Sequence, residues 1–170
     1  PREDYHADLV EKCLIAALAN GPGTISAQGA KLSASAGNSP NTAMIATLAS
    51  IGTVHGGNGA AAVRYLTRIF RDSGLSDPFY AAGKAPLDVS KLVDAEAKRF
   101  AAERAAAKEA GVDYRRIPCM GHPVYKDKPV NHDPREVVIS EHLAGRKIGN
   151  VFLDFYHALA IRLRDIGVSP

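Results

Sequence analysis

Hydrophobic and polar residues alternate along most of the chain with the period of an α-helix. The clearest stretch is Val151–Asp165, in which Phe155, Leu159 and Leu163 recur every fourth residue and would line one helix face. Runs that alternate β-branched and polar residues are almost absent. The pattern therefore predicts an all-α fold. With Gly, Pro and Asn as boundaries, it predicts helices over Tyr5–Ala19, Ser26–Ala36, Thr42–Ile51, Ala60–Arg71, Val89–Ala110, Arg135–Leu143 and Val151–Asp165.

Two stretches between the predicted helices are rich in turn residues. Residues 73–86 form a predicted loop, and residues 112–134 form a second loop that carries most of the candidate chemistry. With 170 residues, 46% of them hydrophobic, the chain is within the range of one domain and can build a packed core. We therefore predict one domain over residues 1–170, with residues 73–88 as the best place for a boundary to a smaller subdomain.

The charge pattern argues against a nucleic-acid-binding protein. The formal net charge is +3, and the basic residues around the long fifth helix are mixed with Glu96, Glu103 and Glu109. This mixture predicts a solvated helix face, whereas a nucleic-acid site would need a stripe of one sign. The basic residues concerned are Lys98, Arg99, Arg104, Lys108, Arg115 and Arg116.

The two cysteines, Cys13 and Cys119, are too few for a disulfide framework or a cysteine metal site. Cys13 falls on an apolar face of the first predicted helix. Cys119 is predicted to be a small buried residue, with a nucleophile beside His122 as the alternative. No apolar run in the sequence is long enough to span a membrane and no signal peptide is recognisable, so we expect a cytoplasmic protein.

A glycine-rich turn, His55-Gly56-Gly57-Asn58-Gly59, precedes the fourth predicted helix. Glycine tolerates the left-handed backbone that other residues avoid, so His55 is expected at a loop-to-helix junction near the positive end of the helix dipole. A neutral imidazole there can donate an N–H group to a developing enolate oxygen. The alternative is a histidine that only caps the helix beside a tight turn.

A second glycine-bearing turn follows the fifth helix. It reads Ile117-Pro118-Cys119-Met120-Gly121-His122-Pro123-Val124-Tyr125-Lys126 and leads to Asp133-Pro134-Arg135. The planar guanidinium of Arg135 is suited to pair with both oxygens of a carboxylate. The alternative for Arg135 is a solvated charge at a helix start, just after an Asp-Pro signal. His132 is interpreted as a surface histidine.

Together, the two histidine turns and the Asp-Pro-Arg segment resemble the active-site turns of the citrate synthase family, which includes the citryl-CoA lyase module of ATP-citrate lyase. The resemblance covers nearly the whole chain and implies an all-α, citrate-synthase-like fold with a small subdomain that closes over the acyl-CoA. The further matching stretches are Ala19-Asn20-Gly21-Pro22, Ile25-Ser26-Ala27, Ala34-Ser35-Ala36-Gly37 and Phe152-Leu153-Asp154-Phe155.

The resemblance implies a role for each residue of the two turns. His55 would stabilise the enol of acetyl-CoA, His122 would polarise the keto oxygen of the acceptor, and Arg135 would hold a carboxylate. Coenzyme A enters as part of the substrate, so no metal and no separate cofactor is required. A homodimer or higher homo-oligomer is also implied. Asn20, Gly56 and Asn58 would bind substrate, and Met120, Gly121, Tyr125, Lys126 and Lys128 would contact coenzyme A.

Four features depart from the family pattern. Asn20 and Gln28 stand where members tend to carry histidine, and Pro123 stands where arginine is common. The gap between His122 and Arg135 is longer than usual. An amide at position 20 can still donate a hydrogen bond but cannot carry charge, so the identity of the keto acid stays open.

The general base of the family is an aspartate, and the resemblance places it beyond Pro170. We therefore expect the chain, which begins with Pro1, to be incomplete at both ends. Asp154 is the alternative inside the chain. It lies within the apolar periodic stretch Val151–Asp165, where an ordinary helix position is favoured.

The whole pattern favours reversible cleavage or formation of a carbon–carbon bond between acetyl-CoA and a 2-keto dicarboxylate. In the cleaving direction, citryl-CoA would give acetyl-CoA and oxaloacetate. Citrate or 2-methylcitrate synthase activity is one alternative, and a non-catalytic acyl-CoA-binding module is the other. We expect no nucleic-acid or membrane partner. The candidates to meet the phosphates of coenzyme A are Lys126, Lys128, Arg162 and Arg164.

Overall fold

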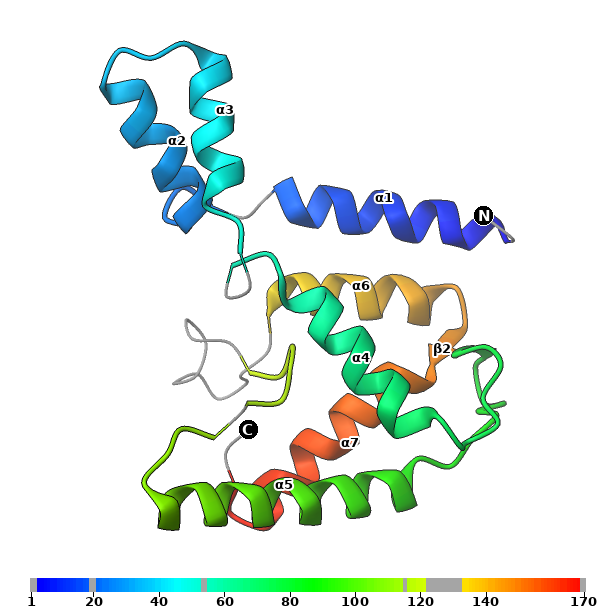
Figure 1. Ribbon diagram of the computed structural model, residues 1–170. Helices are drawn as coiled ribbons and strands as arrows, with labels where there is room; N and C mark the ends of the chain where they lie inside the picture. Colours follow the sequence, from blue (N-terminus) through cyan, green and yellow to red (C-terminus); the bar gives the residue numbers. More distant parts are fainter. Residues whose placement is uncertain (1–2, 19–20, 53–54, 115, 122–132, 169–170) are drawn as a thin grey trace. The chain divides into compact units, whose positions relative to one another are not determined.

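The computed structural model describes residues 3–18, 21–52, 55–114, 116–121 and 133–168. These residues form seven helices and two three-residue strands (Figure 1), so the predicted all-α class is confirmed. In chain order the elements are α1 (Asp4–Leu18), α2 (Ile25–Ser35), α3 (Pro40–Ala49), α4 (Asn58–Phe70), β1 (Phe79–Ala81), α5 (Ser90–Ala110), α6 (Pro134–Gly145), β2 (Ile148–Asn150) and α7 (Val151–Asp165).

The chain divides into two compact units, residues 1–61 and 62–170. The first unit holds α1, α2, α3 and the start of α4, and the second holds the remaining elements. The sequence placed its best boundary at residues 73–88, which lie inside the second unit. That subdomain boundary stays a prediction.

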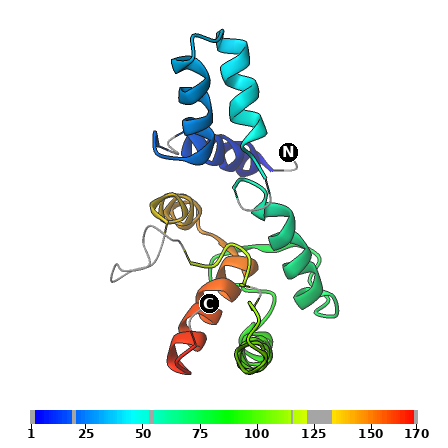
Figure 2. The same cartoon turned by 60° about the vertical axis from the view of Figure 1, so that its left-hand side comes forward.

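In the first unit, α2 and α3 pack side by side as a helical hairpin (Figures 1 and 2). A Cβ on Gly29 would lie 2.6 Å from Ser50 Oγ and 2.8 Å from the Ala46 carbonyl oxygen, so only glycine allows this close approach. None of the described residues of α1, α2 and α3 is buried. The exposed apolar side chains include Val10, Leu14, Ile15, Ile25, Leu32, Met44, Ile45 and Leu48.

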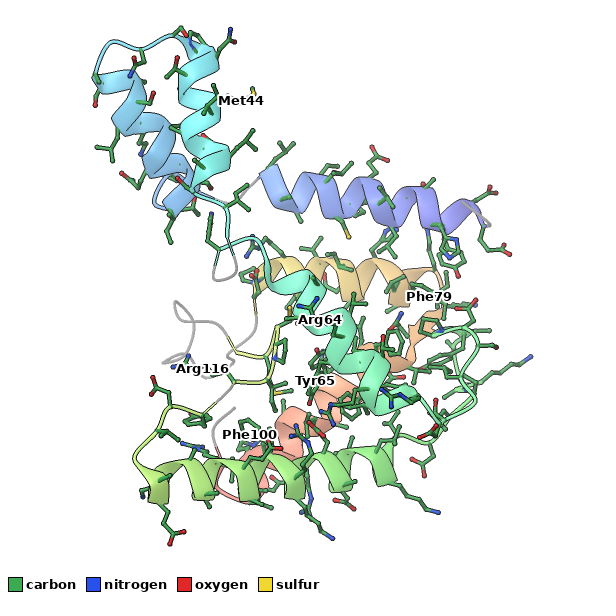
Figure 3. All side chains as sticks on the ribbon, in the orientation of Figure 1. Met44, Arg64, Tyr65, Phe79, Phe100 and Arg116 are labelled. Atoms are coloured by element: carbon green, nitrogen blue, oxygen red, sulfur yellow. The ribbon has the colours of Figure 1, made fainter. Side chains whose placement is uncertain are left out.

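The core of the second unit is built on one face of α7, whose buried residues recur every four positions. Phe70, at the end of α4, packs edge-on against Phe155 with ring centroids 5.4 Å apart. Tyr65 of α4 and Phe100 of α5 point into the same core (Figure 3). In Figure 2, α5 and α6 are seen nearly end-on with α7 between them. The buried core residues are Tyr65, Phe70, Val93, Ala97, Phe100, Ile117, Val151, Phe155, Leu159 and Leu163.

A two-stranded antiparallel sheet joins the segment after α4 to the start of α7. β1 lies in the predicted loop 73–86 and pairs with β2, with Tyr80 opposite Gly149. The prediction of a continuous loop was therefore wrong, because three-residue strands form through a partner far along the chain. A Cβ on Gly149 would lie 2.2 Å from the Tyr80 ring, so glycine is needed beneath the ring. Asn150 then caps α7 by accepting the amide hydrogen of Phe152 at 3.0 Å.

The carboxylate of Glu96 joins α4 to α5 inside the second unit. Its residue is only 4% exposed, so the prediction that it lies on a solvated face was wrong. Arg68 Nη2 of α4 donates to Glu96 Oε1 at 3.0 Å, and Arg99 Nε donates to Oε2 at 2.8 Å. Burial alone would raise the pKa of Glu96, but hydrogen bonds led by that from Arg99 outweigh it and hold the pKa below its ordinary value. The buried anion therefore clamps α4 to α5.

Leu159→Ala should lower the free energy of unfolding by about 2–5 kcal/mol, because it opens a cavity beside the completely buried face of α7. Ile161→Ala on the same helix is the matched control. Ile161 is 51% exposed, so this change should cost less than about 1 kcal/mol. Urea unfolding followed by circular dichroism measures both values, and equal losses would contradict the assignment of this face to the core.

Glu96→Gln should lower the free energy of unfolding at pH 7 by about 1–3 kcal/mol. The guanidinium groups of Arg68 and Arg99 lose their anionic partner. Their side chains are 44% and 36% exposed, so solvent screens part of this loss. Because the folded-state pKa of Glu96 is depressed, its contribution is present above the ordinary glutamate pKa of about 4.3 and is lost as the pH falls through the folded-state pKa. The difference between wild type and variant should therefore shrink between pH 7 and pH 3.

The matched control is Glu103→Gln, since Glu103 also pairs with Arg99 but has a side chain that is 59% exposed. Its replacement should change the free energy of unfolding by less than about 1 kcal/mol at either pH. Urea midpoints at the two pH values are the measurement. A Glu96→Gln effect of the same size at both would show that the carboxylate charge does not clamp the helices.

Candidate active site

His55 lies at the predicted loop-to-helix junction, three residues before α4 begins at Asn58. The Gly52 amide donates to the His55 carbonyl oxygen at 2.8 Å, and Gly52 and Gly56 form a bridge that closes the turn. Gly56 has φ 81°, the left-handed conformation expected of it, and a Cβ there would lie 3.0 Å from Ile51 Cγ2. Position 56 thus requires glycine, because of its positive φ and because Ile51 leaves little room for a side chain. The turn places His55 ahead of the N-terminus of α4.

The His55 ring is held by a residue whose role the sequence did not reveal. Its Nε2 atom lies 3.0 Å from Ser26 Oγ, in the first turn of α2. A hydroxyl can donate or accept, so this contact orients the ring and is compatible with either neutral tautomer. The other ring nitrogen, Nδ1, takes no part in this contact. Ser26 stood out in the sequence only within the stretch Ile25-Ser26-Ala27, and no local signal pairs it with a histidine 29 positions away.

The second turn is described up to Gly121, and its direction is set by the core of the second unit. Ile117 is 3% exposed, and Met120 packs against the same core. The Met120 amide donates to the Ile117 carbonyl oxygen at 3.3 Å, which closes a tight turn over Pro118 and Cys119. Gly121 follows with φ 75°. The chain is therefore well anchored through this turn as far as the described residues extend.

Several predicted site residues lie outside the described part of the chain. The contacts that we predict for Met120, Gly121, Gly56 and Asn58 stay predictions, with Asn58 as the first residue of α4. His55 belongs to the first unit, whereas the turn over residues 117–121 and Arg135 belong to the second. The residues singled out in the sequence that the structure does not describe are Asn20, His122, Pro123, Tyr125, Lys126, Lys128 and His132.

Arg135 lies in the first turn of α6, where the Asp-Pro signal predicted a helix start. Asp133 caps the helix by accepting the backbone amide hydrogen of Arg135 at 2.9 Å. The Arg135 Nε also donates to the two oxygens of Asp133 at 2.9 and 3.1 Å. The guanidinium fork that we predict to hold a substrate carboxylate is thus already oriented by a carboxylate of its own chain.

Asp154, the alternative general base within the chain, is engaged by a tyrosine. It lies in the first turn of α7, and the Tyr80 hydroxyl of β1 donates to its Oδ2 at 2.6 Å. This hydrogen bond, together with burial, raises the pKa of Tyr80 to about 12. The arrangement supports a structural contact between β1 and α7, in keeping with the ordinary helix position favoured for Asp154.

Cys119 is exposed, so its prediction as a small buried residue was wrong. The reason is the tight turn, which directs Ile117 and Met120 to the core and leaves the residue between them outside. Partial burial of the sulfur still raises the pKa of the Cys119 thiol. A raised pKa lowers the fraction of thiolate and disfavours the alternative of an activated nucleophile.

An open groove of about 300 Å³ lies between α5 and α7. Arg162, a candidate for the phosphates of coenzyme A, lines it and pairs there with Asp94 at 2.8 Å. Among the described residues, no group of three or more His, Cys, Asp or Glu side chains is placed to hold a metal ion. No helix in the described ranges is long and apolar enough to cross a bilayer.

The comparison with known proteins matches the chain to one family model. The family model described as "Citrate synthase, C-terminal domain" matches residues 1–163, which include both histidine turns, Arg135 and Asp154. No curated protein and no solved structure matches the chain. Because the family match spans nearly all of the sequence, the chain belongs to the citrate synthase family.

Proposed function

We propose that the protein cleaves citryl-CoA reversibly to acetyl-CoA and oxaloacetate. Family membership supports condensation or cleavage chemistry of the acetyl-CoA type. The choice of cleavage is the finer part of the proposal. It rests on the resemblance of the segments before His55, such as Gly21-Pro22 and Ala36-Gly37, to the ATP-citrate lyase branch.

The observation that carries the proposal is the position of His55 at the head of α4, with its ring held by Ser26. When the carbon–carbon bond of citryl-CoA breaks, its electron pair passes to the acetyl-CoA fragment as an enolate. The imidazole N–H group of His55 would donate to the enolate oxygen, where the helix N-terminus adds favourable electrostatic potential. A ring that is oriented before the reaction stabilises this charge without reorganising.

The other half of the reaction would fall to His122 and Arg135. As the bond breaks, the alcohol carbon becomes the keto carbon of oxaloacetate and its hydroxyl group loses a proton. His122 would accept that proton, and Arg135 would hold a carboxylate of the same fragment. In the structure, Asp133 holds the Arg135 guanidinium through hydrogen bonds from Nε. A carboxylic acid would protonate the enolate carbon.

His55→Ala should slow the exchange of solvent deuterium into the methyl group of acetyl-CoA by about 10²–10³-fold, because it removes the donor to the enolate oxygen. The exchange is measured by NMR on the complete protein, with and without oxaloacetate. His6→Ala, a histidine change in α1 of the same unit, is the matched control and should exchange at the wild-type rate. A wild-type rate for His55→Ala would remove this residue from the mechanism.

The same samples separate the two alternative functions. Citryl-CoA that is converted to acetyl-CoA and oxaloacetate supports the lyase, whereas release of citrate and free coenzyme A supports a synthase. No exchange in the wild type, together with coenzyme A binding detected by calorimetry, would favour the non-catalytic module.

We also infer that a second copy of the chain covers the apolar face of α3. Met44, Ile45 and Leu48 lie on neighbouring turns of this helix and are 66%, 65% and 60% exposed. Met44 points away from α2 in Figure 3. Lys31 is the only Asp, Glu, Lys or Arg between Cys13 and Val63. A surface this apolar and this poor in charge is typical of the core of a protein–protein interface.

Ile45→Glu combined with Leu48→Glu should convert a dimer of the complete protein into a monomer, because each dimer would bury four unpaired carboxylates. Light scattering after size-exclusion chromatography gives the mass, and circular dichroism should show unchanged helicity, since neither side chain is buried within its own chain. Val112→Glu, at a position 60% exposed just beyond α5, is the control and should leave the mass unchanged. A monomeric wild-type protein would contradict the inference.

A further inference from the structure

The turn that precedes His122 has an unusual residue at its third position. Its closing hydrogen bond runs from the Met120 amide to the Ile117 carbonyl oxygen, with Pro118 and Cys119 as the two central residues. Cys119 has φ 58°. Proline at the first central position and positive φ at the second are the features of a type II β-turn. Type II turns favour glycine or asparagine there, so the backbone at Cys119 is locally unfavourable.

A type I turn would relieve this strain without moving the ends of the segment. Types I and II differ mainly in the orientation of the central peptide, here the one between Pro118 and Cys119. In type I, Cys119 would adopt negative φ, which any residue tolerates. Ile117, before the two central residues, and Met120, after them, both pack against the core. The core therefore fixes the two ends of the turn and leaves only the orientation of its central peptide free.

Tyr156 binds that same peptide. Its hydroxyl donates to the Pro118 carbonyl oxygen at 3.1 Å, across from α7. The ring cannot easily move, because it stacks on Tyr65 of α4 with centroids 6.1 Å apart and meets the edge of Phe155 at 6.0 Å. Burial raises the pKa of Tyr156, so the hydroxyl stays protonated and remains a donor throughout the ordinary pH range.

We propose that Tyr156 is a positioning residue that locks the Pro118–Cys119 peptide in the type II orientation, with the Pro118 carbonyl oxygen bound to α7. Turning this peptide over would exchange the sides of the turn on which this carbonyl oxygen and the Cys119 amide hydrogen lie, next to Met120 and Gly121, the predicted coenzyme A contacts. A ligand that meets this face of the turn would then find an acceptor in place of a donor, or the reverse. The effect on activity rests on the proposed function and its predicted coenzyme A contacts, whereas the lock itself does not.

The first test is the cleavage of citryl-CoA by the complete protein. Tyr156→Phe keeps the ring stacking and removes one hydrogen bond, so the rate should fall about threefold to tenfold. Tyr114→Phe is the matched control, because Tyr114 is another half-buried tyrosine, with its ring against Phe100, and should change the rate less than about twofold. Adding Cys119→Gly to Tyr156→Phe should restore most of the rate, since glycine adopts positive φ without strain.

Loss of a merely structural hydrogen bond would not be repaired by a glycine in the turn. A Tyr156→Phe variant as fast as wild type, or one that Cys119→Gly fails to rescue, overturns the proposal while leaving the lyase function intact. A wild type without cleavage activity refutes the lyase function instead, and the lock is then decided by the second measurement.

The second test does not depend on activity. In a Cys13→Ser chain labelled with ¹³C-cysteine, the single Cys119 signal reports its backbone conformation through its Cα and Cβ shifts. Wild-type shifts should indicate positive φ, and Tyr156→Phe should move them toward values for negative φ, whereas Tyr114→Phe should not. Unchanged Cys119 shifts in a folded Tyr156→Phe chain would show that the hydroxyl does not set the peptide orientation.

Discussion

The packing of one face of α7 is the constraint on which the second unit depends. Val151, Phe155, Leu159 and Leu163 lie one above another and are completely buried. The start of this helix is fixed twice, by the Asn150 cap and by the pairing of β2 with β1 immediately before it. Because the register of α7 is set at its first residue, the faces that meet α4, α5 and the turn over residues 117–121 are set with it.

The Glu96 clamp adds a polar constraint that hydrophobic packing alone would lack. A helix that packs through apolar side chains can slide or rotate at modest cost, whereas a buried carboxylate accepts only the arrangement that keeps its hydrogen bonds. Arg68 reaches Glu96 from α4 and lies 5.3 Å from the centre of the Tyr65 ring on the same helix. Together with Phe70, these contacts fix the height and rotation of the C-terminal half of α4. The same helix begins directly after the His55 turn.

Most of what the sequence predicted well depends on local signals. Asp133-Pro134 and Asn150 mark the starts of α6 and α7 because caps and proline act within one helical turn. The position of His55 followed from glycines next to it. What the sequence could not reveal depends on partners far along the chain. β1 needs β2, Glu96 needs Arg68, and His55 needs Ser26, and no periodic pattern encodes such pairs.

The stacked pair of Tyr65 and Tyr156 joins α4 to the turn over residues 117–121. Tyr65 belongs to the helix that follows the His55 turn, and Tyr156 binds the turn that precedes the predicted His122 position. Neither tyrosine belongs to a recognisable motif, and each is an unremarkable aromatic residue of an amphipathic helix in the sequence. Their importance follows from the stacking of their rings and from the hydrogen bond that the Tyr156 hydroxyl donates to Pro118. Substitutions at such a pair act through backbone geometry, and an interpretation of the sequence by motifs would identify neither position.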